Sequence, residues 1–227
     1  MKKITTLLFL VLSATAYSQS WDFESPNYKE IEKNIQDKAS PLFYDTLMVR
    51  FQDADSTLTL QEKRHLYYGF SFHDKYAPYS HSKSLDNLMT LLKKETLSES
   101  ELDQVVNLSD SLLTTNPFDV RAMNYKLFAF DQKREKENFK KTYIKMNTVF
   151  DALLSSGNGT SKEESFYVIY TSHEYDLLNI LGFQFGGMQQ LIEHYDYLTV
   201  AENEAGIEGL YFDVSPCLNA MSNMLGE

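Results

Sequence analysis

The pattern that most constrains the fold runs from residue 25 to residue 156. Over this stretch apolar residues recur at helical spacing, and each such run follows a sequence that is typical of a helix start. Thr59 and Glu62 have the form of a capping box, in which a hydroxyl and a carboxylate each bond the backbone at a helix start. Ser98 and Glu101 repeat that signature. Further helices are predicted from Ser25–Pro26, after Pro41, around Leu85–Leu92, from Phe118 and through Phe139–Leu153. The sequence therefore predicts stacked helices over this stretch.

Residues 116–150 look like one tetratricopeptide-type helical hairpin. Asn116-Pro117-Phe118-Asp119 precedes the first helix, and Lys133–Lys136 is a short polar turn before the second. The Trp-x-x-Leu-Gly block of such repeats is absent, and no clear second copy follows at a period of about 34 residues. An array of helical hairpins and an irregular helical bundle both remain open.

The pattern changes after residue 160. Two short helices are predicted, one from Ser161 to Tyr170 and one from Thr171 to Gly182. Apolar and polar residues then alternate over 183–191, 195–201 and 207–214, which predicts a three-stranded antiparallel meander before a final short helix from Pro216. A three-stranded sheet needs one covered face, so we expect it to dock on the helices. The predicted fold class is mainly α with a small β part (α+β).

The first 18 residues have the layout of a secretory signal peptide. Lys2 and Lys3 precede an apolar run, and small residues precede a cleavage after Ser18. The run is about half of the roughly 20 residues that span a bilayer, which disfavours a membrane anchor. We expect residues 1–18 to be a signal peptide, 19–160 a helical array, and 161–227 a C-terminal part packed with that array. The mature protein is expected in the periplasm of a Gram-negative cell, or secreted.

The charge and cysteine content exclude several classes. Acidic residues outnumber basic ones by 32 to 21, which gives a net charge of −11. The chain therefore lacks the excess of positive charge that binds the phosphates of duplex nucleic acid. The single cysteine, Cys217, can form neither an intramolecular disulfide nor a multi-cysteine zinc site, and its apolar surroundings predict a buried thiol. Asp53-x-Asp55 begins like a calcium loop, but Leu58 replaces the required glycine and Arg64 the final glutamate. We predict no metal and no cofactor.

Catalytic candidates are few. His173 and Glu174 begin a predicted helix, and His194 precedes a predicted strand; such a cluster could bind zinc or transfer protons. Adjacent helical residues point about 100° apart, so His173 and Glu174 would not face each other. We favour the alternative, in which Glu174 caps the helix and His173 is solvated or hydrogen-bonded.

The densest aromatic cluster supplies the binding candidates, which are Tyr67, Tyr68, Phe70, Tyr76 and Tyr79. Aromatic faces stack on sugars or anchor peptides. Helical spacing also places half of the cluster in a core. Ala77-Pro78-Tyr79 is typical of an exposed loop, so Tyr76 and Tyr79 are the best surface pair. Separately, Thr46 and Ser56 follow aspartates in triplets that resemble the O-glycosylation signal of some Gram-negative bacteria.

Short strings along the chain carry a family resemblance. They are Pro26-x-Tyr28, Leu60–Phe70, Asn116–Asp119, His173–Tyr175 and Leu210–Asp213. In these strings the chain resembles an uncharacterised exported bacterial family, labelled domain of unknown function 4919, over nearly the whole mature chain. The resemblance implies no known activity.

Two hypotheses for function follow. The first is a non-enzymatic binding or interaction module of the cell envelope, because stacked hairpins make concave surfaces for peptides or proteins. Its partner would be a protein or peptide, with a glycan as the weaker alternative, and it would bind no nucleic acid and span no membrane. The second is a hydrolase-like enzyme using His173, Glu174 and His194.

Overall fold

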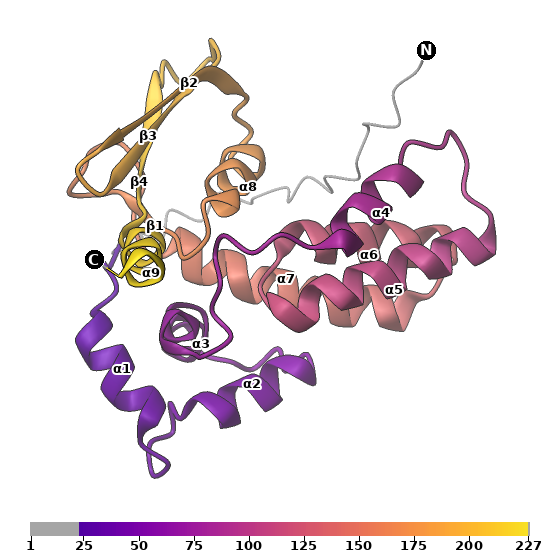
Figure 1. Ribbon diagram of the computed structural model, residues 1–227, viewed down its shortest axis with the longest axis horizontal. Helices are drawn as coiled ribbons and strands as arrows, with labels where there is room; N and C mark the ends of the chain where they lie inside the picture. The colour runs from indigo at the N-terminus through magenta and orange to yellow at the C-terminus, as the bar shows by residue number, and fades with distance from the viewer. Residues whose placement is uncertain (1–22, 227) are drawn as a thin grey trace. The chain divides into compact units, whose positions relative to one another are not determined.

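The computed structural model describes residues 23–226 and divides them into two compact units. One, the helical unit, is residues 81–146; the other, the sheet unit, is residues 23–80 and 147–226. The chain leaves the sheet unit after residue 80 and returns to it after residue 146, within a helix. The described residues are α+β, with nine α-helices and a four-stranded mixed sheet (Figure 1).

The helical unit contains α4 (Lys83–Leu91), α5 (Glu99–Thr115), α6 (Val120–Gln132) and the first part of α7 (Lys136–Leu154). Ser98 and Glu101 form the predicted capping box at the start of α5, and Asn116 ends that helix. The helices enclose a small apolar core of Leu88, Leu91, Leu102, Val105, Leu112, Ala122 and Ala129. The structure does not confirm a tetratricopeptide-like arrangement.

The sheet unit begins with α1 (Tyr28–Gln36), α2 (Tyr44–Gln52), α3 (Leu60–Gly69) and the 3₁₀ turn η1 (Phe70–Phe72). The predicted Thr59–Glu62 capping box is present at α3. Helix α1 begins two residues later than predicted, because the capping residue is Asn27, whose side chain accepts a hydrogen bond from the Glu30 amide, and not Ser25. Helix α3 is central to this unit, since its residues 64–69 are all buried and side chains among them bond the end of α7 and the chain before α8.

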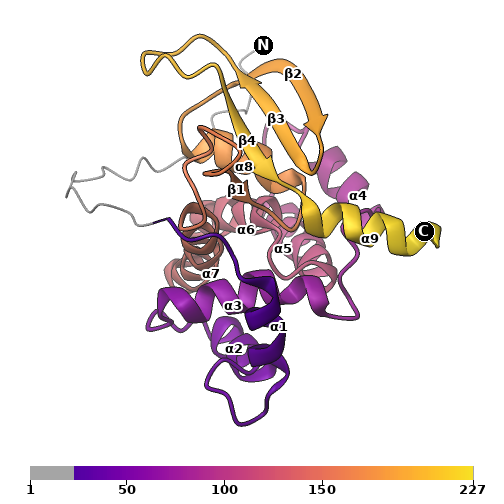
Figure 2. The same ribbon diagram turned by 90° about the vertical axis from the view of Figure 1, so that its left-hand side faces the viewer.

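The remaining elements of the sheet unit are β1 (Phe166–Tyr167), α8 (Ser172–Ile180), β2 (Phe185–Ile192), β3 (Tyr195–Val200), β4 (Gly209–Asp213) and α9 (Ser215–Leu225). The strand order is β1-β4-β3-β2, so the predicted antiparallel meander is present with a fourth, parallel strand added. Helix α9 continues from β4 and extends away from the sheet (Figure 2).

The helix predicted over 161–170 was wrong, and the hydrogen bonds show why. The Ser161 hydroxyl does accept from the Glu164 amide, as in a capping turn. The Glu164 carbonyl, however, accepts from Asn158 and Gly159, which closes a loop instead of starting a helix. The following segment then pairs with β4, where Val168 donates to the Asp213 carbonyl. Long-range pairing, together with the strand preference of aromatic and β-branched residues, prevails over the local start signal.

Register assigns the two faces of the sheet. Asp196 on β3 lies opposite Phe212, and Gln189 on β2 lies opposite Leu198. These residues share one face, which contacts α8 through Gln189, and we call it the inner face. The other face carries Tyr195, Tyr197 and Tyr211, and we call it the outer face.

Candidate functional site

Three predicted binding residues belong to the core. Tyr67, Tyr68 and Phe70 are only 1%, 0% and 2% exposed, so a ligand at the surface cannot stack on them. The Tyr67 hydroxyl lies 2.6 Å from Nδ1 of His173 and accepts from the Ile169 amide at 3.2 Å. Every residue from 64 to 70 is buried, so the end of α3 and the start of η1 are enclosed on all sides, which corrects the expectation of a binding surface at this point.

Tyr76 and Tyr79 differ from the buried three. Tyr76 is half-buried, and its hydroxyl donates to the Ile169 carbonyl at 2.6 Å. Tyr79 is 40% exposed and is therefore the more accessible member of the predicted surface pair. Burial raises the pKa of the Tyr79 hydroxyl, and Cys217, Asp196 and Glu174 add to that shift.

Glu174 occupies a buried carboxyl cluster at the inner face of the sheet. Its side chain is fully buried, and Gln189 Nε2 lies 3.5 Å from Glu174 Oε2 and 2.8 Å from Asp196 Oδ2. Gln189 Oε1 in turn accepts from the Tyr175 hydroxyl at 2.7 Å. Burial, followed by the neighbouring charge of Asp196, raises the pKa of Glu174 to about 9. Glu174 is therefore protonated at neutral pH, and Gln189 ties the β2–β3 hairpin to α8.

His194 lies apart from His173 and Glu174. It is in the tight turn between β2 and β3, where its ring lies 4.1 Å from that of Tyr195 and its Nε2 lies 3.5 Å from Asp213. Tyr195 and Asp213 are outer-face residues, whereas Glu174 meets the inner face. The sheet thus separates the members of the catalytic candidate. Within residues 23–226 no group of three or more His, Cys, Asp or Glu residues could hold a metal ion.

Cys217 is buried, as predicted, and is 1% exposed. Burial raises the pKa of its thiol to about 12. A thiol of this kind is neither a nucleophile at neutral pH nor an accessible redox group. None of the helices in the described part of the chain has the length and apolarity to cross a membrane.

A cavity of about 260 Å³ lies between α1 and α3, lined by Glu24, Asn27, Glu30, Ile31, Leu42, Gln61, Arg64 and His65. Its two buried polar side chains are already engaged. Arg64 donates to the Ser155 hydroxyl at 2.7 Å and to the Glu24 carbonyl at 2.6 Å. His65 uses both ring nitrogens, one on the Gln61 carbonyl and one on Asn34. The Arg64 and His65 side chains therefore stabilise the fold, and few polar groups of the cavity are left to recognise a ligand.

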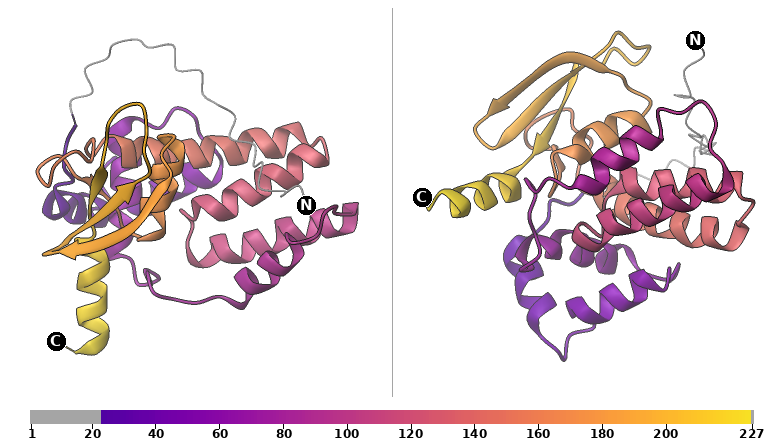
Figure 3. Two further views of the ribbon diagram at one scale, coloured as in Figure 1. Left: turned by 90° about the horizontal axis from the view of Figure 1, so that it is seen from above. Right: turned by 45° about the vertical axis from the view of Figure 1, so that its right-hand side comes forward.

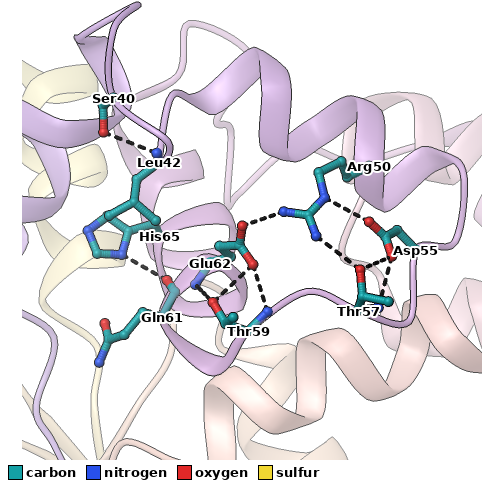
Figure 4. A network of polar contacts seen from close by, with 9 residues as sticks. All are labelled: Ser40, Leu42, Arg50, Asp55, Thr57, Thr59, Gln61, Glu62 and His65. Carbon is teal, nitrogen blue, oxygen red and sulfur yellow. Dashed lines mark hydrogen bonds and ion pairs between the residues drawn. The ribbon is translucent and has the colours of Figure 1, made fainter.

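Asp55, the second aspartate of the stretch that resembles a calcium loop, belongs to a different network (Figure 4). Asp55 accepts from the Thr57 amide at 2.8 Å and from Arg50 Nε at 2.7 Å. Arg50 also pairs with Glu62, the carboxylate of the α3 capping box. The network joins the end of α2 to the start of α3 and is a structural brace.

Strand β2 is the feature that the sequence predictions missed as a site. It lies at one edge of the sheet (Figure 3). Seven of its eight residues are exposed. It contains no charged residue and no proline. Phe185, Met188 and Leu191 are 40%, 59% and 53% exposed. The absence of charge from this one strand of an acidic chain is the signal that could have identified it.

A bulge protects only the first half of this edge. The register shifts between Phe185 and Gln189, where Gly187 has a positive φ of 97° and the Met188 amide donates to the Thr199 hydroxyl. Residues 189–192 then pair regularly with β3. In the alternation of an antiparallel pair, Gln190 and Ile192 direct their backbone groups to β3, and Gln189 and Leu191 direct theirs outward. The second half is therefore an unprotected edge.

Comparison with known proteins gives one match. A family model with the description "Domain of unknown function (DUF4919)" matches residues 29–223, which is most of the chain. No curated protein and no solved structure shows a significant match.

Proposed function

Because the chain belongs to the family DUF4919, whose description carries no activity, we propose its function from its own geometry: it is a non-enzymatic binding module that captures an extended peptide segment on the edge of β2. The observation that carries the proposal is the regular, uncharged, exposed edge at residues 189–192. The signal-like sequence of residues 1–18, which lies outside the described residues, supports a place in the cell envelope.

Strand addition fits this edge physically. An added strand would pair with the outward backbone groups of Gln189 and Leu191, which supply main-chain hydrogen bonds. The exposed side chains of Met188 and Leu191 would bury apolar surface of the partner. The hairpin is held in place from behind by the Gln189 contacts with α8, so the edge is ordered before the peptide arrives.

The hydrolase alternative has less support. His173 and Glu174 are fully buried, and His194 lies beyond the opposite face of the sheet. An enzyme that uses these three side chains needs one position from which a substrate atom can reach all three by hydrogen bonds. The described residues provide no such convergence, so we do not propose a reaction.

Peptide selection on the full chain tests the proposal. A random display library of extended peptides is selected, and Kd is measured for the selected peptides. Leu191→Pro removes the backbone N–H of residue 191, which points away from β3, and leaves the hydrogen bonds between β2 and β3 intact. Because the peptide loses this hydrogen bond, the variant should bind it about tenfold or more weakly. Leu191→Ala removes the side chain and keeps the donor, and its loss should be smaller. No selected binder, or equal binding by the Leu191→Pro variant, would overturn the proposal.

A further inference from the structure

The outer face of the sheet carries a second feature, separate from the β2 edge. Tyr197 on β3 lies directly opposite Tyr211 on β4, and Tyr195 lies two residues before Tyr197 on the same face. All three side chains are partly exposed. The Tyr197 and Tyr211 ring centroids are 4.7 Å apart with an interplanar angle of 44°. We call the Tyr197–Tyr211 pair the tyrosine platform.

Gly209 explains how the platform is built. A Cβ atom at Gly209 would lie 2.4 Å from Cζ of Tyr197 and 2.5 Å from its hydroxyl oxygen. The Tyr197 ring therefore lies across the bare backbone of Gly209, in space that a side chain would fill. The ring covers the backbone of Gly209 on one side, and the side chain remains partly exposed. Tyr211 beside it restricts the ring further, so little side-chain freedom is lost when a ligand binds.

Polar groups surround the platform without giving it a net cationic character. Gln190 on β2 lies opposite Tyr197 on the same face and offers an amide. Lys162 lies 5.6 Å from the Tyr195 ring centroid and is paired with Glu193 at 3.2 Å, so its charge is compensated. Burial and then Tyr211 raise the pKa of the Tyr197 hydroxyl, with Glu208 adding to the shift, so the phenol is neutral at physiological pH.

We propose that the tyrosine platform binds a neutral carbohydrate, with one sugar ring stacked on Tyr197 and Tyr211. The electron-rich faces of the tyrosines attract the polarised C–H groups on the flat side of a sugar ring. The tyrosine hydroxyls and the Gln190 amide bond sugar hydroxyls at the rim. The chain's net charge of −11 disfavours an acidic glycan or a nucleic acid at the same place.

The test is a calorimetric titration of the full chain with maltohexaose, cellohexaose and chitohexaose, followed by nuclear magnetic resonance with any oligosaccharide that binds. At least one should bind and shift the resonances of Tyr197 and Tyr211. Tyr197→Ala and Tyr211→Ala should each weaken binding by about tenfold. Tyr197→Phe keeps the ring and should retain most of the affinity, which separates lost stacking from lost folding.

Two control variants show whether sugar binding belongs to the tyrosine platform. Tyr143, a partly exposed tyrosine of the helical unit stacked on Phe139 at 6.4 Å, is the matched control, and Tyr143→Ala should bind the sugar as the wild type does. Leu191→Pro should also leave sugar binding unchanged, so the platform can be correct even if peptide capture at the β2 edge fails. Absence of binding to all three oligosaccharides, or undiminished binding by the Tyr197→Ala variant, would overturn the inference.

Discussion

The hydroxyl of Tyr67 lies 2.6 Å from Nδ1 of His173, a residue 106 positions further along the chain. This bond joins α3 to the first turn of α8, and the same hydroxyl accepts from the Ile169 amide just before that helix. Tyr67 was a candidate for binding and His173 a candidate for catalysis, although a solvated or hydrogen-bonded His173 was the favoured alternative. Their burial and mutual contact make them part of the framework that holds α8 against the rest of the sheet unit.

Removing the Tyr67 hydroxyl should therefore destabilise the fold. Tyr67→Phe leaves the buried Ile169 amide without its acceptor and takes away a close partner of His173, which should lower the free energy of unfolding by about 1–3 kcal/mol. Urea denaturation followed by circular dichroism measures this. Tyr143→Phe, at a partly exposed helical site, should change it by less than about 0.5 kcal/mol. Equal stability of the Tyr67→Phe variant and wild type would contradict the assigned role.

Glu174 should give the protein a distinctive pH dependence. Burial and the charge of Asp196 raise its pKa from 4.5 to about 9 in the folded state, so the folded protein keeps a proton that the unfolded chain releases. This contribution to stability is complete below the unfolded pKa and is lost as the pH rises towards 9. Glu174→Gln cannot release a proton and should flatten the fall in melting temperature between about pH 5 and pH 9.

Glu62→Gln is the control for that pH profile. Burial acts to raise the pKa of Glu62, but hydrogen bonds from Thr59 and Arg50 lower it overall. Its stabilising contribution is therefore present above the unfolded pKa and is lost as the pH falls, which is the opposite sign. If Glu174→Gln and wild type lose stability in parallel towards pH 9, Glu174 is not the buried proton carrier described here.

Arg64 should be irreplaceable by lysine. Its guanidinium is 2% exposed and bonds the Ser155 hydroxyl and the Glu24 carbonyl at once, which a single ammonium group cannot reproduce. Arg64→Lys should cost about 2–3 kcal/mol of stability by urea denaturation. Arg50→Lys, in the more exposed brace with Asp55 and Glu62, should cost less than about 1 kcal/mol. Equal costs for the two variants would contradict the distinction.

Cys217 should be inert in the native protein. Its burial and its raised pKa of about 12 predict negligible alkylation by iodoacetamide at pH 8. In urea the same thiol should react within minutes, and mass spectrometry counts the modified chains. Rapid labelling of the folded protein would show that α9 opens readily at its first turn.

The sequence predicted what local chemistry determines. The capping boxes at Thr59 and Ser98 and the burial of Cys217 are confirmed, because each follows from neighbouring residues in the chain. The parallel strand β1 could not be predicted in the same way. Its pairing of Phe166 with Phe212 joins segments far apart in the sequence and competes with a local helix-start signal.

The candidate site depends still more on tertiary structure. Alternation predicted β2 as a strand, but its place at the edge follows from the strand order, and only the register shows which backbone groups point outward. Tyr67, Tyr68 and Phe70 were binding candidates although helical spacing also placed half of their cluster in a core, and packing assigns all three to the core. Tyr197 and Tyr211 were read as alternating strand residues, and their arrangement over Gly209 appears only when β3 and β4 are paired.

Amide hydrogen exchange at Leu191 tests the central claim, that the β2 edge takes an added strand. In the free protein this outward amide should exchange rapidly, whereas the amide of Gln190, bonded to β3, should be protected. In complex with a peptide selected on the full chain, the Leu191 and Gln189 amides should become protected while that of Gln190 changes little. A bound peptide that leaves the Leu191 and Gln189 amides exchanging at their free rates would contradict the account.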